Sequence, residues 1–207
     1  MPHISLPARG QARGTAVLLH GLGADEHDLL GVAATLPHHL QRVSLRAPLS
    51  LPWGGYAWYP LRTVPGGAAP GIPWPKGTSE AGGLAAAVAA VRATCAALPA
   101  AAPAVLIGFS QGAAVALATV LAAPAEFAGC ALLSGLPPAG IALGPLPPGF
   151  PVFVAHGTED HLLPLAEGRR LRDHLQAAGA AVAYHEYALA HGIADEELED
   201  LAAWLPA

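Results

Sequence analysis

The sequence is poor in several kinds of residue, and each scarcity excludes a class of protein. Charged side chains make up 12% of the 207 residues and hydrophobic ones 53%, which excludes an intrinsically disordered chain. Lys76 is the only lysine and the net charge is -5, so a nucleic-acid-binding groove, which needs many basic side chains to neutralise phosphates, is not expected. The two cysteines, Cys95 and Cys130, stand in separate apolar runs and predict buried reduced thiols rather than a disulfide.

A long uninterrupted apolar run is also absent. A helix that crosses a bilayer needs about twenty apolar residues. The nearest stretch, residues 82–99, is mainly alanine and contains Arg92, which favours a soluble helix packed on another element. Residues 1–13 have neither the apolar core nor the cleavage site of a secretory leader. We therefore predict a cytoplasmic protein without stable membrane insertion.

Short apolar runs alternate with helical patterns along the chain. Continuous apolar runs are typical of parallel strands that helices cover on both faces. The alternation predicts one α/β domain, residues 1–207, with three layers, a mainly parallel sheet and no separate cap domain. The expected strands are 16–19, 41–47, 104–109, 130–133, 151–155 and 181–187, the last nearer an edge, and the expected helices are 26–36, 79–97, 110–122, 165–178 and 195–204.

Two Gly- and Pro-rich stretches interrupt this alternation. Residues 48–78, which we call the excursion, hold Trp53, Tyr56, Trp58, Tyr59 and Trp74. Because disordered tracts are poor in aromatic residues, we expect an ordered excursion over the active-site edge of the sheet. An exposed aromatic surface there would also serve as a homodimer contact, which leaves that oligomer open. Residues 135–148 are expected to form a plain loop.

The segment Gly108-Phe109-Ser110-Gln111-Gly112 carries the strongest chemical signal. An apolar run precedes it and an alanine-rich helical run follows it, so the chain turns sharply from strand to helix at Ser110. Such a turn strains the serine and lifts its hydroxyl clear of the sheet, and the glycines let strand and helix approach closely. We interpret Ser110 as a nucleophile, in preference to a serine that merely caps a helix.

A serine nucleophile needs a general base, which an acid orients. In folds of this kind the acid precedes the histidine, and each follows a strand. Asp160 lies in the polar turn after the fifth expected strand and His191 follows the last one, so we predict them as acid and base. Glu159 is a competing acid, and His185 is disfavoured as base because it lies inside a strand pattern.

The run His20-Gly21-Leu22-Gly23 follows the first expected strand and is a candidate oxyanion hole. Acyl transfer needs two backbone N–H groups aimed at the developing alkoxide, and glycine lets the backbone come close. We expect these donors from Leu22 and from Gln111, the residue after the nucleophile, with Gly23 as a further contact for the substrate. A dinucleotide-binding loop would require a third glycine where the sequence has Glu26.

The ten histidines raise the question of a metal site. The candidates are His20, His156, His161 and the adjacent pair His38 and His39. No His-x-x-x-His spacing and no matched set of carboxylates accompanies them in the sequence. We therefore expect neither a metal nor another cofactor.

Together these motifs resemble those of the α/β-hydrolases, and specifically the small phospholipase/carboxylesterase family, which includes the acyl-protein thioesterases. The resemblance covers nearly the whole chain and rests on segments 19–30, 108–113, 156–160 with Pro164, and 191–192. It implies an α/β-hydrolase sandwich, the triad Ser110, Asp160 and His191 with Asp160 preferred to Glu159, and oxyanion donors at Leu22 and Gln111. It also implies that Trp58 and Tyr59 lie near the acyl pocket and bind substrate.

These residues predict a serine carboxylesterase that hydrolyses short-to-medium acyl or aryl esters through an acyl-serine intermediate. Its partner is then a small-molecule ester. An acyl-protein thioesterase or lysophospholipase is an alternative that needs a longer apolar channel, and the compact excursion favours the smaller esters. A non-catalytic binding protein on a hydrolase scaffold is the alternative from another class.

Overall fold

A mainly parallel sheet forms the centre of the computed structural model, which describes residues 1–64, 67–68, 71–74, 76–99, 102–137 and 144–205. Among these residues, seven strands form one sheet in the order β1-β3-β2-β8-β9-β10-β11. Their bounds are β1 (His3–Leu6), β2 (Gly14–Leu19), β3 (Leu40–Leu45), β8 (Ala104–Phe109), β9 (Phe127–Leu133), β10 (Pro151–Gly157) and β11 (Ala181–Tyr187). Only the pairing of β1 with β3 is antiparallel in this sheet.

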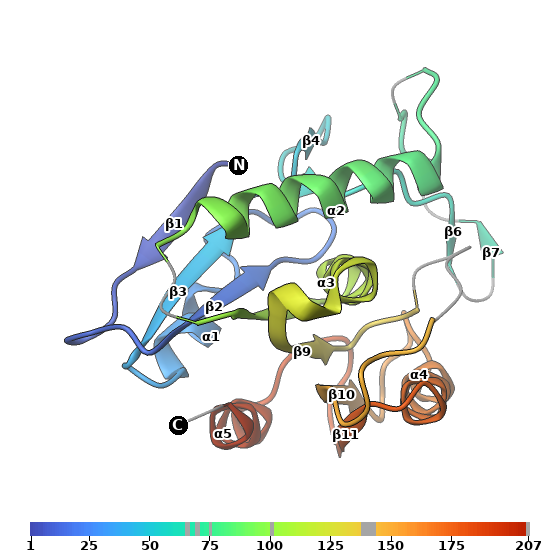
Figure 1. Ribbon diagram of the computed structural model, residues 1–207. Helices are drawn as coiled ribbons and strands as arrows, with labels where there is room; N and C mark the ends of the chain where they lie inside the picture. The colour runs from blue at the N-terminus through green and yellow to red at the C-terminus, as the bar shows by residue number, and fades with distance from the viewer. Residues whose placement is uncertain (65–66, 69–70, 75, 100–101, 138–143, 206–207) are drawn as a thin grey trace.

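Helices cover both faces of the sheet (Figure 1). On one face pack α2 (Glu80–Ala97), α3 (Gln111–Ala122) and α4 (Leu165–Ala177), and on the other α1 (Leu30–Thr35) and α5 (Asp195–Trp204). A hydrophobic core lies on each face of the sheet. Along β2, Val17 and Leu19 belong to the core under α2, α3 and α4, while Ala16 and Leu18 belong to the core under α1 and α5; all four are fully buried. The continuous apolar run thus reflects burial on both faces. This confirms the predicted three-layer α/β fold.

The N-terminal part differs from the sequence-based expectation in two places. The edge strand β1 was not expected, and the first helix begins at Leu30 rather than at residue 26. Residues 26–29 form turns instead; just before them the carboxylate of Asp25 accepts the backbone N–H of His27, and Glu26 is ion-paired to Arg46. Because these polar side chains bond to partners outside a helix, the helix α1 begins only after them, at Leu30.

Other expectations concern the edge strand, the cysteines and the membrane. Strand β11 lies at an edge of the sheet, as its alternating pattern indicated. Both cysteines are free, with Cys130 buried and Cys95 half-buried, and burial raises the pKa of the Cys130 thiol to about 12. Within the described part of the chain, no helix combines the length and the apolar character that crossing a bilayer requires.

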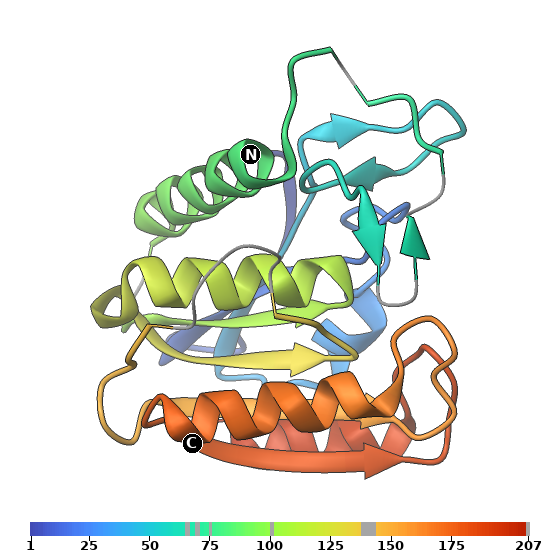
Figure 2. The ribbon, with the colours of Figure 1, turned by 90° about the vertical axis from the view of Figure 1, so that its right-hand side faces the viewer.

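The excursion contains two short strand pairings, β4 (Leu49–Ser50) with β5 (Tyr56–Ala57) and β6 (Thr63–Val64) with β7 (Gly67–Ala68). It lies beside the end of the sheet toward which the arrowheads of the parallel strands point (Figure 2). Residues 65–66, 69–70 and 75 of the excursion lie outside the described residues. In the expected loop 135–148, residues 135–137 and 144–148 have neither helix nor strand, and 138–143 lie outside the described residues.

The carboxyl ends of the parallel strands lie together at the end of the sheet beside the excursion (Figure 2). Four polar residues follow directly or closely on them: His20 after β2, Ser110 after β8, Asp160 after β10 and His191 after β11. In open α/β sheets, ligands bind outside the carboxyl ends of the strands. The fold therefore gathers the predicted functional residues where such sheets bind ligands.

Candidate active site

Ser110 occupies a strained turn between β8 and α3. Its φ of 52° and ψ of -114° place a non-glycine residue at positive φ, which costs free energy and persists only where the surroundings enforce it. A Cβ atom on Gly108 would lie 2.4 Å from the carbonyl oxygen of Gly112, so the turn has no room for side chains at its flanks. The sharp strand-to-helix turn is thus present at the predicted position.

Ser110, His191 and Asp160 form one chain of hydrogen bonds. The Nε2 of His191 lies 3.0 Å from the Oγ of Ser110, and its Nδ1 lies 2.7 Å from the Oδ2 of Asp160. Because an ionised carboxylate only accepts, the Nδ1–H donates to Asp160, which leaves Nε2 free to accept the serine proton. The ring of Phe109 packs against the imidazole, with 5.0 Å between the ring centroids.

Backbone groups hold the carboxylate of Asp160 in place. Its Oδ1 accepts the N–H of Leu162 at 2.9 Å and of Leu163 at 2.8 Å, and the residue is buried. Each carboxylate oxygen therefore has a defined partner, with Oδ2 left for His191. The competing Glu159 is exposed and its backbone N–H bonds to Leu189. Asp160, and not Glu159, contacts the imidazole.

His156 lies beside Asp160, a position that the sequence did not indicate. Its imidazole is buried, with Nε2 2.7 Å from the carbonyl oxygen of Leu163 and 3.6 Å from Oδ2 of Asp160. The ring also fills the space beside Gly168, where a Cβ atom would lie 2.6 Å from Nδ1. This residue, weighed above as a metal ligand, thus helps to shape the turn that carries Asp160.

His20 determines the orientation of the peptide bond between Gly21 and Leu22. Its Nε2 accepts the backbone N–H of Ala47 at 3.1 Å, so the proton lies on Nδ1 and is donated to the carbonyl oxygen of Gly21 at 2.7 Å. Burial lowers the pKa of His20, which favours this neutral form. In a planar trans peptide the C=O and the N–H point in opposite directions. By holding the Gly21 carbonyl, His20 therefore also sets the direction of the Leu22 N–H.

Gln111 supplies the second candidate oxyanion donor. It is the first residue of α3, where backbone N–H groups have no acceptor within the helix and the helix dipole is positive. Among the described residues, the N–H of Leu22 has no acceptor either. Leu22 and Gln111 both line the cavity that contains Ser110. Two free donors thus border the nucleophile.

The cavity beside Ser110 has a volume of about 330 Å³ and mainly apolar walls. Tyr59 and Leu61 come from the excursion, and Ala114 comes from α3. Leu136 and Leu162 are also part of the wall. No periodic pattern marks these leucines, so the sequence did not single them out.

Of the three expected substrate contacts, only Tyr59 is among the described residues that line this cavity. Trp58 is buried beneath it, with its indole N–H donated to the carbonyl oxygen of His20 at 2.8 Å. The N–H of Gly23 is donated to Tyr56 at 2.9 Å. The structure thus buries Trp58 in the framework of the site, whereas Gly23 is exposed and lies outside the described lining of this cavity.

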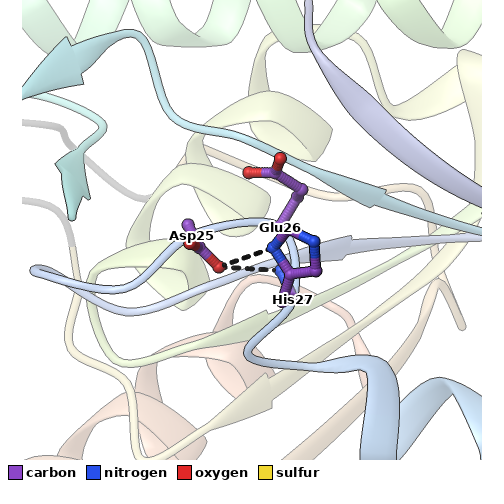
Figure 3. Close-up of side chains that lie close together, drawn as sticks. All are labelled: Asp25, Glu26 and His27. Carbon is purple, nitrogen blue, oxygen red and sulfur yellow. Dashed lines mark hydrogen bonds and ion pairs between the residues drawn. The ribbon is translucent and has the colours of Figure 1, made fainter.

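Within the described residues, one cluster has ligand atoms close enough to hold a metal ion: Asp25, Glu26 and His27 (Figure 3). Both carboxylate oxygens of Glu26 already bond to Arg46, which lowers the pKa of Glu26 to about 2. One oxygen of Asp25 accepts both the backbone N–H and the imidazole of His27. These contacts account for the cluster as the turn that precedes α1.

Comparison with known proteins finds carboxylesterases and acyl-protein thioesterases among the relatives of this chain. The carboxylesterase SOBER1 of Arabidopsis thaliana is 31% identical over 105 residues, which are 48% of this chain and 46% of that protein. Acyl-protein thioesterase 1 of Yarrowia lipolytica is 27% identical over 226 aligned residues, covering 99% of this chain and 96% of that protein. The chain spans less than half the length of the curated carboxylesterases that it matches.

The fold and the family are shown by two further comparisons. The crystal structure of Zea mays acyl-protein thioesterase 2 superposes with a TM-score of 0.80 at 24% identity, covering 98% of this chain and 96% of that chain. A model of the Phospholipase/Carboxylesterase family matches residues 4–207. The match includes the strand-to-helix turn at Ser110 and the loop at His191, and this chain belongs to the phospholipase/carboxylesterase family of α/β-hydrolases.

Proposed function

We propose that the protein is a serine carboxylesterase with Ser110 as nucleophile, His191 as base and Asp160 as the acid that orients the base. The observation that carries this proposal is the chain of hydrogen bonds from Ser110 through His191 to Asp160 beside an apolar cavity. The carboxylesterases and thioesterases among its relatives support the same class of reaction.

In the first half of the reaction, the Oγ of Ser110 attacks the ester carbonyl while the Nε2 of His191 takes the hydroxyl proton. The buried carboxylate of Asp160 stabilises the imidazolium that forms. The N–H groups of Leu22 and Gln111 bind the alkoxide of the tetrahedral intermediate. The alkoxide then re-forms the carbonyl, the C–O bond to the alcohol breaks, and His191 gives its proton to the leaving alcohol.

In the second half, water replaces the alcohol. His191 removes a proton from the water as it attacks the acyl-serine, and the same two N–H groups bind the second alkoxide. Collapse of this intermediate releases the carboxylic acid and returns the proton to Ser110. The reaction needs no external oxidant or reductant, because only an ester bond and water are exchanged.

The size of the cavity favours short-to-medium acyl or aryl esters. Its volume of about 330 Å³ stands at the lower end of the range of roughly 300–1,000 Å³ for small-molecule sites. Each methylene that enters an apolar site contributes about 0.8 kcal/mol, or roughly fourfold in kcat/KM. We expect kcat/KM on chromogenic esters to rise with acyl length until the cavity is full and then to level off. For an acyl-protein thioesterase or lysophospholipase, the second candidate, kcat/KM would instead continue to rise up to palmitoyl substrates.

Labelling with a fluorophosphonate tests the enzyme class directly. The wild-type protein should be labelled and should hydrolyse the short esters, whereas Ser110→Ala should lose both. Ser5→Ala, which changes an exposed serine on the distant edge strand β1, is the matched control. A wild-type protein that is neither labelled nor active would favour the non-catalytic binding protein. The cytoplasmic location and the homodimer contact stay predictions from the sequence.

A further inference from the structure

One short part of the excursion connects the loop after β2 with the first turn of α3, the two elements that carry the oxyanion donors. We call residues 56–59 the bridge segment. Its first residue, Tyr56, makes two backbone hydrogen bonds to the loop after β2. The N–H of Gly23 is donated to the carbonyl oxygen of Tyr56 at 2.9 Å, and the N–H of Tyr56 is donated to the carbonyl oxygen of Ala24 at 2.8 Å. A Cβ atom on Gly55 would lie 1.9 Å from the carbonyl oxygen of Gly23, so the backbones touch there.

Trp58 extends this contact to the residue that orients the first donor. Its indole N–H is donated to the carbonyl oxygen of His20 at 2.8 Å, and only 1% of its surface is exposed. The indole and imidazole rings lie 5.4 Å apart between centroids. Because the side chain of His20 holds the carbonyl of Gly21, the indole acts through His20 on the Leu22 N–H.

The side-chain amide of Gln111 binds the same segment from the other side. Its Oε1 accepts the backbone N–H of Trp58 at 2.9 Å, and its Nε2 donates to the carbonyl oxygen of Tyr59, also at 2.9 Å. The residue is 5% exposed, so loss of either bond would leave a buried polar group unpaired. One side-chain amide thus binds the backbone N–H of Trp58 and the backbone carbonyl of Tyr59, at two points of the bridge segment.

We propose that Trp58 and the side chain of Gln111 are positioning residues that fix the separation of the two oxyanion donors. The donors lie beyond the ends of β2 and β8, which pair up to Leu19 and Gly108. Beyond that pairing, a continuous path of hydrogen bonds runs from His20 through Trp58 to Gln111. An oxyanion hole works only when both donors lie 2.7–3.1 Å from the alkoxide, and displacement of a group by about 1 Å costs on the order of 10² in rate.

This inference rests on the proposed esterase function and specifies how its transition state is stabilised. Trp58 does not belong to the described lining of the cavity, so it has no contact through which to bind the ground state. A change that removes only its N–H should therefore lower kcat and leave KM nearly unaltered. A purely structural role would instead lower the melting temperature without changing turnover per active site.

Trp58→Phe is the primary test, because it removes the indole N–H and retains an aromatic ring. We expect kcat per fluorophosphonate-titrated site to fall 10- to 100-fold, with KM within about twofold of wild type. The inhibition constant of a trifluoromethyl ketone, whose hemiketal oxyanion occupies the hole, should rise by the same factor as kcat/KM falls. Trp53→Phe, at a 63% exposed tryptophan of the same excursion, is the control and should change neither quantity.

Gln111→Met provides a second and independent test. It keeps the side-chain volume and the backbone donor but removes both hydrogen bonds to the bridge segment, and it should produce the same separation of kcat from KM. Because both residues act through one segment, the double variant should lose less activity than the product of the two single effects. If Trp58→Phe does not fold, Gln111→Met and its ketone affinity decide the question.

The outcomes separate this inference from the function on which it rests. Loss of activity in Ser110→Ala together with unchanged kcat and ketone affinity in Trp58→Phe and Gln111→Met would overturn the positioning role alone. Equal rises in KM for both variants, with kcat unchanged, would also overturn it and would assign the bridge segment to substrate binding. Full activity in Ser110→Ala would overturn the esterase proposal itself.

Discussion

Gly112 lies against Leu19 so closely that a Cβ atom on the glycine would come within 2.0 Å of the leucine's carbonyl oxygen. The contact joins the first turn of α3 to the end of β2, one strand away from the turn that carries Ser110. Because the obstructing atom belongs to the backbone, no side-chain rotation relieves the clash. The second glycine of the motif is therefore required by packing before any chemistry is considered.

Gly112→Ala should consequently destabilise the fold. Forcing extra volume into a packed backbone contact typically costs 1–3 kcal/mol, so we expect the free energy of unfolding in urea to fall by about 3 kcal/mol. Gly31→Ala is the matched control, since its Cβ meets open space on α1 and should change stability by no more than about 1 kcal/mol, in the stabilising direction. Equal effects of the two changes would contradict the packing argument.

The choice between two adjacent acids gives a second prediction. Asp160→Asn keeps the shape of the side chain, but its amide can donate to Nδ1 of His191 and so favour the wrong tautomer. We expect kcat on a short ester to fall by about 10⁴. Glu159→Gln, at the exposed neighbour, should stay within about twofold of wild type. A larger loss of kcat in Glu159→Gln than in Asp160→Asn would show that Glu159, and not Asp160, is the acid.

The wall of the cavity gives a third prediction. Leu61→Ala removes apolar volume that the excursion contributes to the lining. The preferred acyl chain should lengthen by a few methylenes, each of which contributes roughly fourfold to kcat/KM. Leu49→Ala, on the same excursion but outside the described lining, should leave the acyl-length profile unchanged. Identical profiles for Leu61→Ala and wild type would show that acyl chains bind elsewhere.

The buried carboxyl of Glu197 makes stability depend on pH. It lies on α5 with Oε2 accepting the N–H of Ala194 at 3.3 Å, while Oε1 has no partner among the described residues. Burial raises its pKa from 4.5 to about 7, so the folded state binds the proton more tightly than the unfolded chain does. The resulting stabilisation is complete below about pH 4.5 and is lost as the pH rises through about 7.

Glu197→Gln should remove this dependence. In the wild-type protein, this group should lower the free energy of unfolding by about 3 kcal/mol between pH 4.5 and pH 8. Denaturant titrations at several pH values should show that slope in wild type and in Glu199→Gln, which changes an exposed neighbour on the same helix. A slope that persists in Glu197→Gln would place its origin in another group.

The fold and the arrangement of the triad follow from signals that are local in sequence. Each of Ser110, Asp160 and His191 comes soon after an apolar run, and parallel strands bring such positions to one edge of a sheet. The glycines around Ser110 add a backbone requirement that few other residues meet. For these reasons their contacts could be anticipated without coordinates, whereas their catalytic roles stay predictions until the variants are measured.

Features that depend on distant partners could not be anticipated in this way. Across the part of the chain that the structure describes, the short strand β1 pairs only with β3, and its four residues are too few for a periodic signal. The burial of Trp58 depends on bonds to His20 and Gln111, which stand far from it in the chain. The family resemblance implied Trp58 as a substrate contact. An aromatic residue beside a site can bind substrate or hold the framework, and only the direction of the indole N–H distinguishes the two roles.

The position of β11 at the open edge of the sheet has a consequence for biosynthesis. During translation the serine at the end of β8 emerges well before the histidine that follows β11. Because β11 pairs only with β10 among the described residues, that histidine reaches the serine only after β11 has docked. A nascent chain on the ribosome therefore carries an unactivated serine hydroxyl until β11 and the histidine that follows it have been synthesised and have docked on β10.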